Sequence, residues 1–193
     1  MSTIDTPIIW RTGIKVTLRP HRAEDLSVNQ RWINDPEINR HLTVTWPIHK
    51  SGQQSWLDQA TANSADDISL AIWTIEETSR LIGNTAMRIN PTKQSADTGT
   101  LIGSKTDHSK GYATDAKMLL LEYAFQTRAV RKVTSKILSS NSASQKYAQK
   151  CGYRHMATIE QEHFHNGRWI NEEQYVVFRD EWLPLWEEYQ KAL

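Results

Sequence analysis

The sequence contains one cysteine, Cys151, among its 193 residues, so no disulfide bond can form within the chain. A chain without disulfides fits a reducing compartment, and we expect a cytoplasmic protein. One thiolate is too few for a cysteine-based metal knuckle, so we expect no metal. Residues 1–5 lack the basic start of a signal peptide, and no stretch approaches the roughly 18 apolar residues of a membrane helix.

Net charge is also nearly absent, because the formal charge is +1 at pH 7. Because positive and negative charges are so evenly balanced, the chain has no general attraction to nucleic acid or to a membrane surface, and we expect neither as a partner. The chain is 38% hydrophobic and 23% charged, as in ordinary globular proteins. Its length suits one domain, residues 1–193.

Tryptophan, in contrast, is abundant, with eight residues. Trp46, Trp56, Trp73 and Trp169 are candidates for lining a ligand cleft. Most tryptophans in a domain of this size fill the core, because each ring buries a large apolar area.

The pattern of apolar residues predicts a mixed α/β (α+β) domain with one central sheet flanked by helices. Asn166-Gly167 lies between the last two strands and is a strong hairpin signal. The expected strands are 14–18, 68–75, 81–89, 98–103, 132–138, 153–165 and 168–178. The expected helices are 22–33, 51–62, 113–126, 141–150 and 181–193, and the expected loops include 39–49, 91–95 and 107–111.

The helix expected at 113–126 has a broad apolar side, and Asp115, Glu122 and Gln126 mark its narrow solvent face. The segment 108–116 follows a strand and opens this helix. Because the first N–H groups of a helix have no partner within it, and the macrodipole adds positive charge there, phosphate is a natural ligand.

Two residues of this segment favour a phosphate site. Gly111 lets the backbone approach a ligand, and Lys110 adds positive charge. An ordinary loop-to-helix junction explains the residues equally well. A Walker loop does not, because it needs Gly-Lys and the order here is Lys-Gly.

The segment resembles the coenzyme A loop of GNAT acetyltransferases, Gln/Arg-x-x-Gly-x-Gly/Ala, which aligns with His108, Gly111 and Ala113. His108 departs from the pattern, so its phosphate contact is expected to be weaker or to depend on pH. The resemblance implies that the loop amides bind the pyrophosphate of acetyl-CoA, the co-substrate.

A second segment resembles the other GNAT signature, in which an Asn begins a short helix that ends in Gly-Phe. It is most similar to the RimJ/RimL-like branch, on Asn141, Ser144, Gly152 and Tyr153. The resemblance implies the GNAT fold, with a single mixed, mostly antiparallel sheet. The cofactor-binding residues that it implies are Ile102, Gly103, His108, Lys110, Gly111, Tyr112, Ala113, Thr114, Asn141 and Ser144.

The implied reaction transfers acetyl to a primary amine by direct attack. Because an amine near pKa 10 is protonated at neutral pH, a base must remove a proton. The resemblance places this base on the strand before the Asn-Gly turn, where a carboxylate is often found and this chain has His163. Asp97 is the alternative base, and the resemblance places Ser144 beside the thioester sulfur. The family's tyrosine acid aligns with Ala148. Tyr147 lies about 100° around the helix from that position, and we expect it to pack.

Three functions stay open: an acetyltransferase for a small amine, one for a protein N-terminal α-amine, and a non-catalytic CoA-binding module. The acceptor pocket is expected between the first two helices, the Trp46 loop and the last hairpin.

Many relatives form dimers, and the Trp-rich tail offers a surface for a homodimer. His163 and His165 share a strand face, but no third metal ligand is evident. The acidic residues Asp35, Glu37, Asp58 and Glu162 could attract a cationic amine or simply be solvated.

Overall fold

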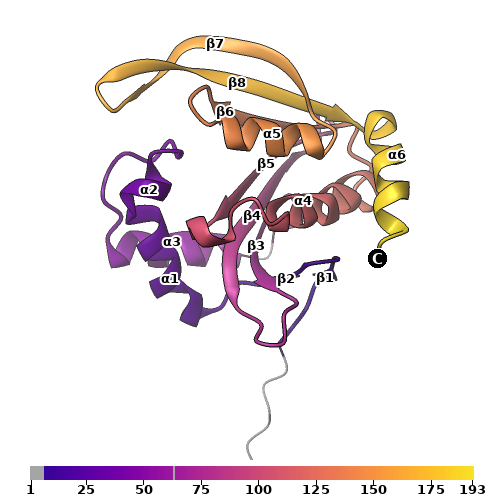
Figure 1. Ribbon diagram of the computed structural model, residues 1–193, viewed down its shortest axis with the longest axis horizontal. Coiled ribbons are helices and arrows are strands. Elements are labelled where there is room, and N and C mark those ends of the chain that lie inside the picture. Colours follow the sequence, from indigo (N-terminus) through magenta and orange to yellow (C-terminus); the bar gives the residue numbers. More distant parts are fainter. Residues whose placement is uncertain (1–6, 63) are drawn as a thin grey trace, which may run out of the picture.

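The computed structural model describes residues 7–62 and 64–193, so the N-terminal segment 1–5 discussed above lies outside the described residues. The described chain forms an eight-stranded sheet with helices on both faces (Figure 1). The strands are β1 (Arg11–Thr12), β2 (Val16–Arg19), β3 (Asp67–Thr74), β4 (Leu81–Asn90), β5 (Ser95–Ile102), β6 (Lys132–Leu138), β7 (Arg154–His165) and β8 (Arg168–Phe178).

Six α-helices connect or flank these strands. Short 3₁₀ turns, η1 (Ala23–Asp25) and η2 (Lys105–Asp107), precede α1 and α4, and a π-helical turn, η3 (Tyr123–Thr127), extends α4. The helices are α1 (Leu26–Asn34), α2 (Pro36–Asn39), α3 (Lys50–Ala60), α4 (Tyr112–Glu122), α5 (Ser142–Lys150) and α6 (Arg179–Gln190).

The strand order is β1-β2-β3-β4-β5-β6-β8-β7, and β5–β6 is the only parallel pair in the described sheet. The expected single mixed, mostly antiparallel sheet flanked by helices is therefore confirmed. The prediction for the fourth strand was wrong at its start: β5 begins at Ser95, within the expected loop 91–95. These first residues of β5 pair with the end of β4 on one side and with β6 on the other, and the β6 partner leaves no local pattern.

The ladder between β5 and β6 is short. It joins 95–97 to 132–134 and then stops, although both strands continue. Beyond it, the Ser135 hydroxyl donates to the carbonyl of Thr98 at 3.1 Å, a side-chain contact in place of a ladder bond. The sheet is therefore open at the carboxyl ends of these two strands.

The helices α4, α5 and α6 cover one face of the sheet, and the core lies between them and the sheet. Figure 1 shows α4 beneath α5 on this side. The expectation that Asp115 faces solvent was wrong, because its side chain is 4% exposed. Its carboxylate accepts backbone N–H groups of Ile14, Lys15 and Val16 from the turn between β1 and β2. A buried acid is stable when such donors surround it, and periodicity cannot reveal a partner 100 residues away.

The Trp-rich tail belongs to this core as well. Trp182 is fully buried and Trp186 is 8% exposed, with their rings stacked at 5.3 Å. The tail therefore does not offer these two rings as a dimer surface, and the expected homodimer stays a prediction. α6 packs on the chain's own β8 instead, where burial of the two rings in the core removes apolar surface from water.

The opposite face of the sheet is covered only in part. Next to β3 and β4, the Asn84 amide donates to Asn29 of α1 at 2.9 Å, and His21 packs edge-on against Trp56 of α3. Further along this face, Asp97 of β5 and Lys136 of β6 are exposed. Helices thus cover this face next to β3 and β4, and they leave Asp97 and Lys136 exposed on β5 and β6.

The last two strands form the hairpin that Asn166-Gly167 predicts. Both residues have positive φ, +51° and +79°, as a type I′ turn requires. β7 carries a bulge at Gln161, where φ is +52° and the register with β8 shifts. No helix among the described residues is both long and apolar enough to cross a membrane.

Candidate functional site

The loop after β5 ends at a left-handed glycine. Gly111 has φ +88° and ψ −1° and is the N-cap of α4, a conformation that favours glycine because a Cβ is strained there. Within the described chain, the backbone N–H groups of 109–114 have no protein acceptor. The loop therefore presents consecutive free donors at the positive end of an 11-residue helix, which suits an anionic ligand.

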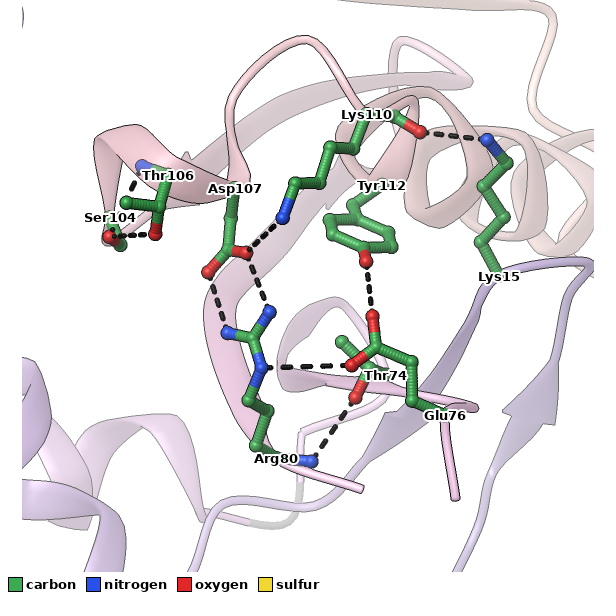
Figure 2. A network of polar contacts seen from close by, with 9 residues as sticks. All are labelled: Lys15, Thr74, Glu76, Arg80, Ser104, Thr106, Asp107, Lys110 and Tyr112. Carbon is green, nitrogen blue, oxygen red and sulfur yellow. Dashed lines mark hydrogen bonds and ion pairs between the residues drawn. The ribbon is translucent and has the colours of Figure 1, made fainter. Parts of the chain in front are cut away.

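A polar network holds the loop in place (Figure 2). Asp107, buried in η2, accepts two hydrogen bonds from the Arg80 guanidinium, at 2.6 and 2.7 Å. This pairing lowers the pKa of Asp107 and raises that of Arg80. The Lys110 ammonium lies 3.3 Å from the same carboxylate. Lys110 thus adds positive charge beside the loop, as expected, but its side chain points toward Asp107.

Lys15 supplies a second ammonium that the sequence analysis missed. Its Nζ donates to the carbonyl of Lys110 at 2.8 Å, as Figure 2 shows. The same atom would lie 3.3 Å from a Cβ on Gly111. The turn carrying Lys15 is 95 residues away in the sequence, so no local motif could have assigned it to this loop.

A cavity of about 670 Å³ lies beside the loop, lined by Ile14, Lys15, Ile75, Glu76, Ser109, Lys110 and Tyr112. The Tyr112 ring is buried, and its hydroxyl donates to Glu76 at 2.5 Å. This contact is the main reason why the pKa of Tyr112 is raised. The side chain of Tyr112 is therefore held in place by Glu76 at the wall of the cavity.

The end of β5 and the first loop residue pack tightly. The His108 ring donates from Nε2 to the carbonyl of Ile102 at 3.1 Å. Gly103 lies against the Trp32 ring of α1, whose atoms would be about 2 Å from a Cβ at this position. The sequence-predicted residues Ile102, Gly103 and His108 are thus brought together, with His108 turned toward the strand end.

Ala113 and Thr114 follow in the first turn of α4 and are half-buried. Cys151, at the end of α5, is fully buried in the core. Burial raises the pKa of its thiol to about 12. The thiol therefore stays protonated.

At the start of α5, the Asn141 side chain accepts the backbone N–H of Ser144 at 3.1 Å, an ordinary N-cap. Ser144 is half-buried. Ala148, at the position of the family's tyrosine, is a core residue that is 2% exposed. Tyr147 packs against the core, and its hydroxyl donates to Thr100 of β5 at 3.0 Å.

The two candidate bases, Asp97 and His163, lie on the face of the sheet opposite the one that α4, α5 and α6 cover. Strand neighbours point to opposite faces, so Asp97 points away from the core that Ala96 joins. The Thr134 hydroxyl donates to Asp97 at 3.2 Å, and loss of hydration raises the pKa of this carboxylate. His163 lies on this face too, and its Nε2 is 3.0 Å from the Glu172 carboxylate. Glu172 is a second residue that the sequence analysis missed.

The open ladder between β5 and β6 thus separates the two groups of residues. The phosphate-type loop, Ser144 and Tyr147 lie toward the core face, whereas Asp97, His163 and Glu172 lie on the partly uncovered face. A ligand that passes between the two strands could reach both groups.

The loop after α2 lies near the hairpin and the loop after β5. Burial is the largest cause that lowers the pKa of His41, and Arg40, His108 and His165 lower it further by their charges. The acceptor pocket expected between these segments stays a prediction. Of the four acidic candidates, Asp35 caps α2, Glu37 pairs with Lys105, Asp58 accepts from Gln54 and Glu162 is exposed.

No group of three or more metal-ligating side chains occurs in the part of the chain that the structure describes. Trp46 and Trp169 are about 60% exposed, whereas Trp56 and Trp73 are half-buried. The tryptophans that fill the core are those of α6.

The sequence matches the model of the Acetyltransferase (GNAT) domain family over residues 15–154. A curated relative from Bacillus licheniformis, "Uncharacterized N-acetyltransferase p20", is 22% identical over 174 residues, which cover 87% of this chain and 95% of the relative.

Solved structures share the fold. A spermidine N-acetyltransferase from Vibrio cholerae, crystallised with CoA and spermine, superposes with a TM-score of 0.76 at 20% identity, over 87% of this chain and 98% of that chain. A GCN5-related N-acetyltransferase from Brucella melitensis superposes with a TM-score of 0.75 at 23% identity, over 93% of this chain and 83% of that chain.

Proposed function

Because the chain belongs to the GNAT acetyltransferase domain family, it is an acyl-CoA-dependent N-acetyltransferase, and we propose that it transfers acetyl from acetyl-CoA to a primary amine by direct attack. The acceptor is a small-molecule amine or a protein N-terminal α-amine. The resemblance of Asn141, Ser144, Gly152 and Tyr153 to the RimJ/RimL-like branch points to a protein N-terminus, but these motifs say little about the acceptor, so both classes are kept.

One observation carries this proposal: the free backbone donors of 109–114 around left-handed Gly111. A diphosphate needs several donors within a short span, and this turn provides them together with the ammonium of Lys15. The residues therefore fit the diphosphate of acetyl-CoA, which when bound supplies an activated acetyl thioester.

Direct attack agrees with the state of the chain's one thiol. Cys151 is fully buried, and its pKa of about 12 keeps it protonated. It is therefore unsuited to carry the acetyl group between the two substrates. Acetyl transfer then requires both substrates to be bound at once, which also provides the entropic advantage of proximity.

We assign His163 as the base and Ser144 as the group beside the sulfur. The acceptor ammonium gives one proton to His163, and its lone pair forms the new N–C bond while the C–S bond breaks. The second amine proton passes to the leaving thiolate, with the Ser144 hydroxyl able to relay it. Asp97 is the rival base, because its raised pKa moves it toward the working range of a general base.

The acceptor is identified by an amine panel: spermidine, an amino sugar, an aminoglycoside and a peptide with a free N-terminus, each with acetyl-CoA and detection of released thiol. Turnover with small amines, or with the peptide alone, selects the acceptor class. Tight CoA binding without turnover on any amine contradicts the catalytic proposal and supports the alternative, a non-catalytic CoA-binding module.

His163→Ala tests the base, with His165→Ala as the matched control on the same strand face. We expect His163→Ala to lower kcat by roughly 10²- to 10⁴-fold with little change in CoA affinity. An unchanged kcat removes His163 from the mechanism, and Asp97→Asn then tests the rival.

We further propose that the protein is a cytoplasmic homodimer. Since Trp182 and Trp186 are buried, the exposed pair Phe164 and Trp169 at the hairpin tip is the better apolar surface for pairing. Light scattering of the protein and of a Trp169→Ser variant tests this. A monomeric mass for the parent chain contradicts the dimer.

A further inference from the structure

Two histidine–glutamate pairs join β7 and β8. His163 Nε2 lies 3.0 Å from Glu172 Oε2, and His155 Nε2 lies 2.7 Å from Glu173 Oε2. Because Glu172 and Glu173 are strand neighbours, the two pairs lie on opposite faces of the hairpin. The same chemistry therefore occurs twice, once on the face of the candidate site and once away from it.

The two pairs differ in burial. The side chains of His163 and Glu172 are 23% and 6% exposed, whereas those of His155 and Glu173 are 45% and 17% exposed. An ion pair or hydrogen bond in solvent is weak, and one removed from water is stronger and better ordered. The His163–Glu172 pair is therefore the one that can hold a ring in a fixed orientation.

The Glu172 carboxylate is well supplied with donors. Its Oε1 accepts the Gln174 side chain at 3.2 Å and lies 3.8 Å from the Lys136 ammonium, while Oε2 faces His163. A buried carboxylate is costly unless such donors surround it. This arrangement keeps a charged acceptor next to the imidazole at low exposure.

The contact determines which imidazole nitrogen is available. An ionised carboxylate only accepts, so Nε2 carries the proton and donates to Glu172. The lone pair of the neutral ring is then on Nδ1, which no described residue bonds. His165, two residues along on the same face, is buried, and its Nε2 has no partner among the described residues.

We propose that Glu172 is the positioning residue for His163. It fixes the imidazole tautomer that leaves Nδ1 free, and it stabilises the imidazolium that forms when Nδ1 takes the proton of the acceptor ammonium. No bond to Glu172 is made or broken, and the positive charge moves from the substrate nitrogen to the ring beside the carboxylate. This inference rests on the proposed function, in which His163 is the base.

The test compares Glu172→Gln with Glu173→Gln, its matched control on the other face. We expect Glu172→Gln to lower kcat by roughly 10- to 100-fold, part of what a whole general base contributes. CoA affinity and acceptor KM stay within about twofold. The acidic limb of the kcat/KM-against-pH profile moves to lower pH, because the carboxylate that favours the imidazolium is gone. Glu173→Gln leaves kcat and the profile unchanged.

A double-mutant cycle separates positioning from other roles. In a His163→Ala background, Glu172→Gln should have no further effect on kcat. If it lowers kcat equally in both backgrounds, Glu172 acts independently of His163 and the inference is wrong. Equal effects of the two glutamine variants, or a loss of activity with an unmoved pH profile, also overturn it.

Failure of this inference can be told apart from failure of the proposed function. If His163→Ala leaves kcat unchanged, the base assignment fails and this inference fails with it. If His163→Ala lowers kcat and Glu172→Gln does not, only the positioning role is wrong. Circular dichroism checks folding. If Glu172→Gln does not fold, Glu172→Asp keeps the charge but withdraws it from Nε2, and a smaller shift of the pH profile in the same direction is expected.

Discussion

The hydroxyl of Tyr189 donates a hydrogen bond to the carboxylate of Asp115 at 2.5 Å. The same carboxylate accepts backbone N–H groups from the turn that carries Lys15. One buried acid thus ties α4, α6 and the β1–β2 turn together and sets the place of the ammonium beside Gly111. The phosphate-type loop depends on this tertiary junction as well as on its own residues.

Asp115→Asn should lower both stability and CoA affinity. We expect the free energy of unfolding to fall by roughly 2 to 4 kcal/mol, because several charge-assisted hydrogen bonds weaken at a buried position. CoA affinity should fall roughly tenfold as Lys15 loses its fixed position. Urea unfolding and calorimetric titration measure the two effects.

Tyr189→Phe is the matched control for this prediction. It removes one bond to Asp115 but leaves the backbone contacts of the turn in place, so stability should fall by about 1 kcal/mol without loss of CoA affinity. Equal losses of affinity in both variants would show that the turn does not act through Lys15.

The role of Gly111 in binding CoA can be tested by comparison with Gly167, a left-handed glycine in the hairpin turn. Gly111→Ala and Gly167→Ala introduce a Cβ at φ +88° and +79° respectively, and each should cost about 1 to 2 kcal/mol of stability. Only Gly111→Ala should weaken CoA binding, by tenfold or more, because its Cβ also meets the Lys15 ammonium. Titration of both variants with CoA decides the question. Comparable binding by the two variants contradicts a ligand at this loop.

Lys117 is buried in α4, and its ammonium has no hydrogen-bond partner in the described chain. It lies 5.8 and 5.9 Å from the ring centres of Tyr147 and Tyr153. Burial lowers its pKa from 10.5 to about 8. Below pH 8 the lysine is charged in both the folded and the unfolded chain, and the folded chain carries the full cost of burying the charge.

Lys117→Met should therefore stabilise the protein at pH 7, by up to about 3 kcal/mol. Between pH 8 and 10.5 the folded chain of the parent protein releases this proton before the unfolded chain does, so its stability rises relative to the variant. The advantage of methionine should shrink over that range. Urea unfolding of both proteins at pH 7 and pH 9.5 measures it, and a difference that does not change with pH contradicts the assignment.

Cys151 should be unreactive in the native protein. It is fully buried and its pKa is about 12, so the thiolate that reacts with Ellman's reagent is scarce and inaccessible at pH 8. We expect one equivalent of thiol in guanidinium and essentially none without it. Rapid reaction of the native protein would show that α5 opens readily. The predicted result also means that Cys151 does not disturb the thiol-release assay.

The alternation of apolar and polar residues was sufficient to predict most of the elements. The strand 132–138 and the hairpin strand 168–178 were predicted with the bounds that the structure has. The predicted helix 22–33 was less accurate, because a 3₁₀ turn, η1, precedes α1 at Leu26. α2 was missed, since it is a four-residue helix with too few positions for a period.

The sequence by itself determined most of the secondary structure, the family and the loop at Gly111, because these depend on local periodicity, turn chemistry and a short motif. Tertiary structure alone decided that Asp115 is buried, that the tail tryptophans belong to the core, and that Lys15 and Glu172 lie beside the candidate residues. Each of these facts depends on a partner on another element, and a single chain carries no local signal of such a partner.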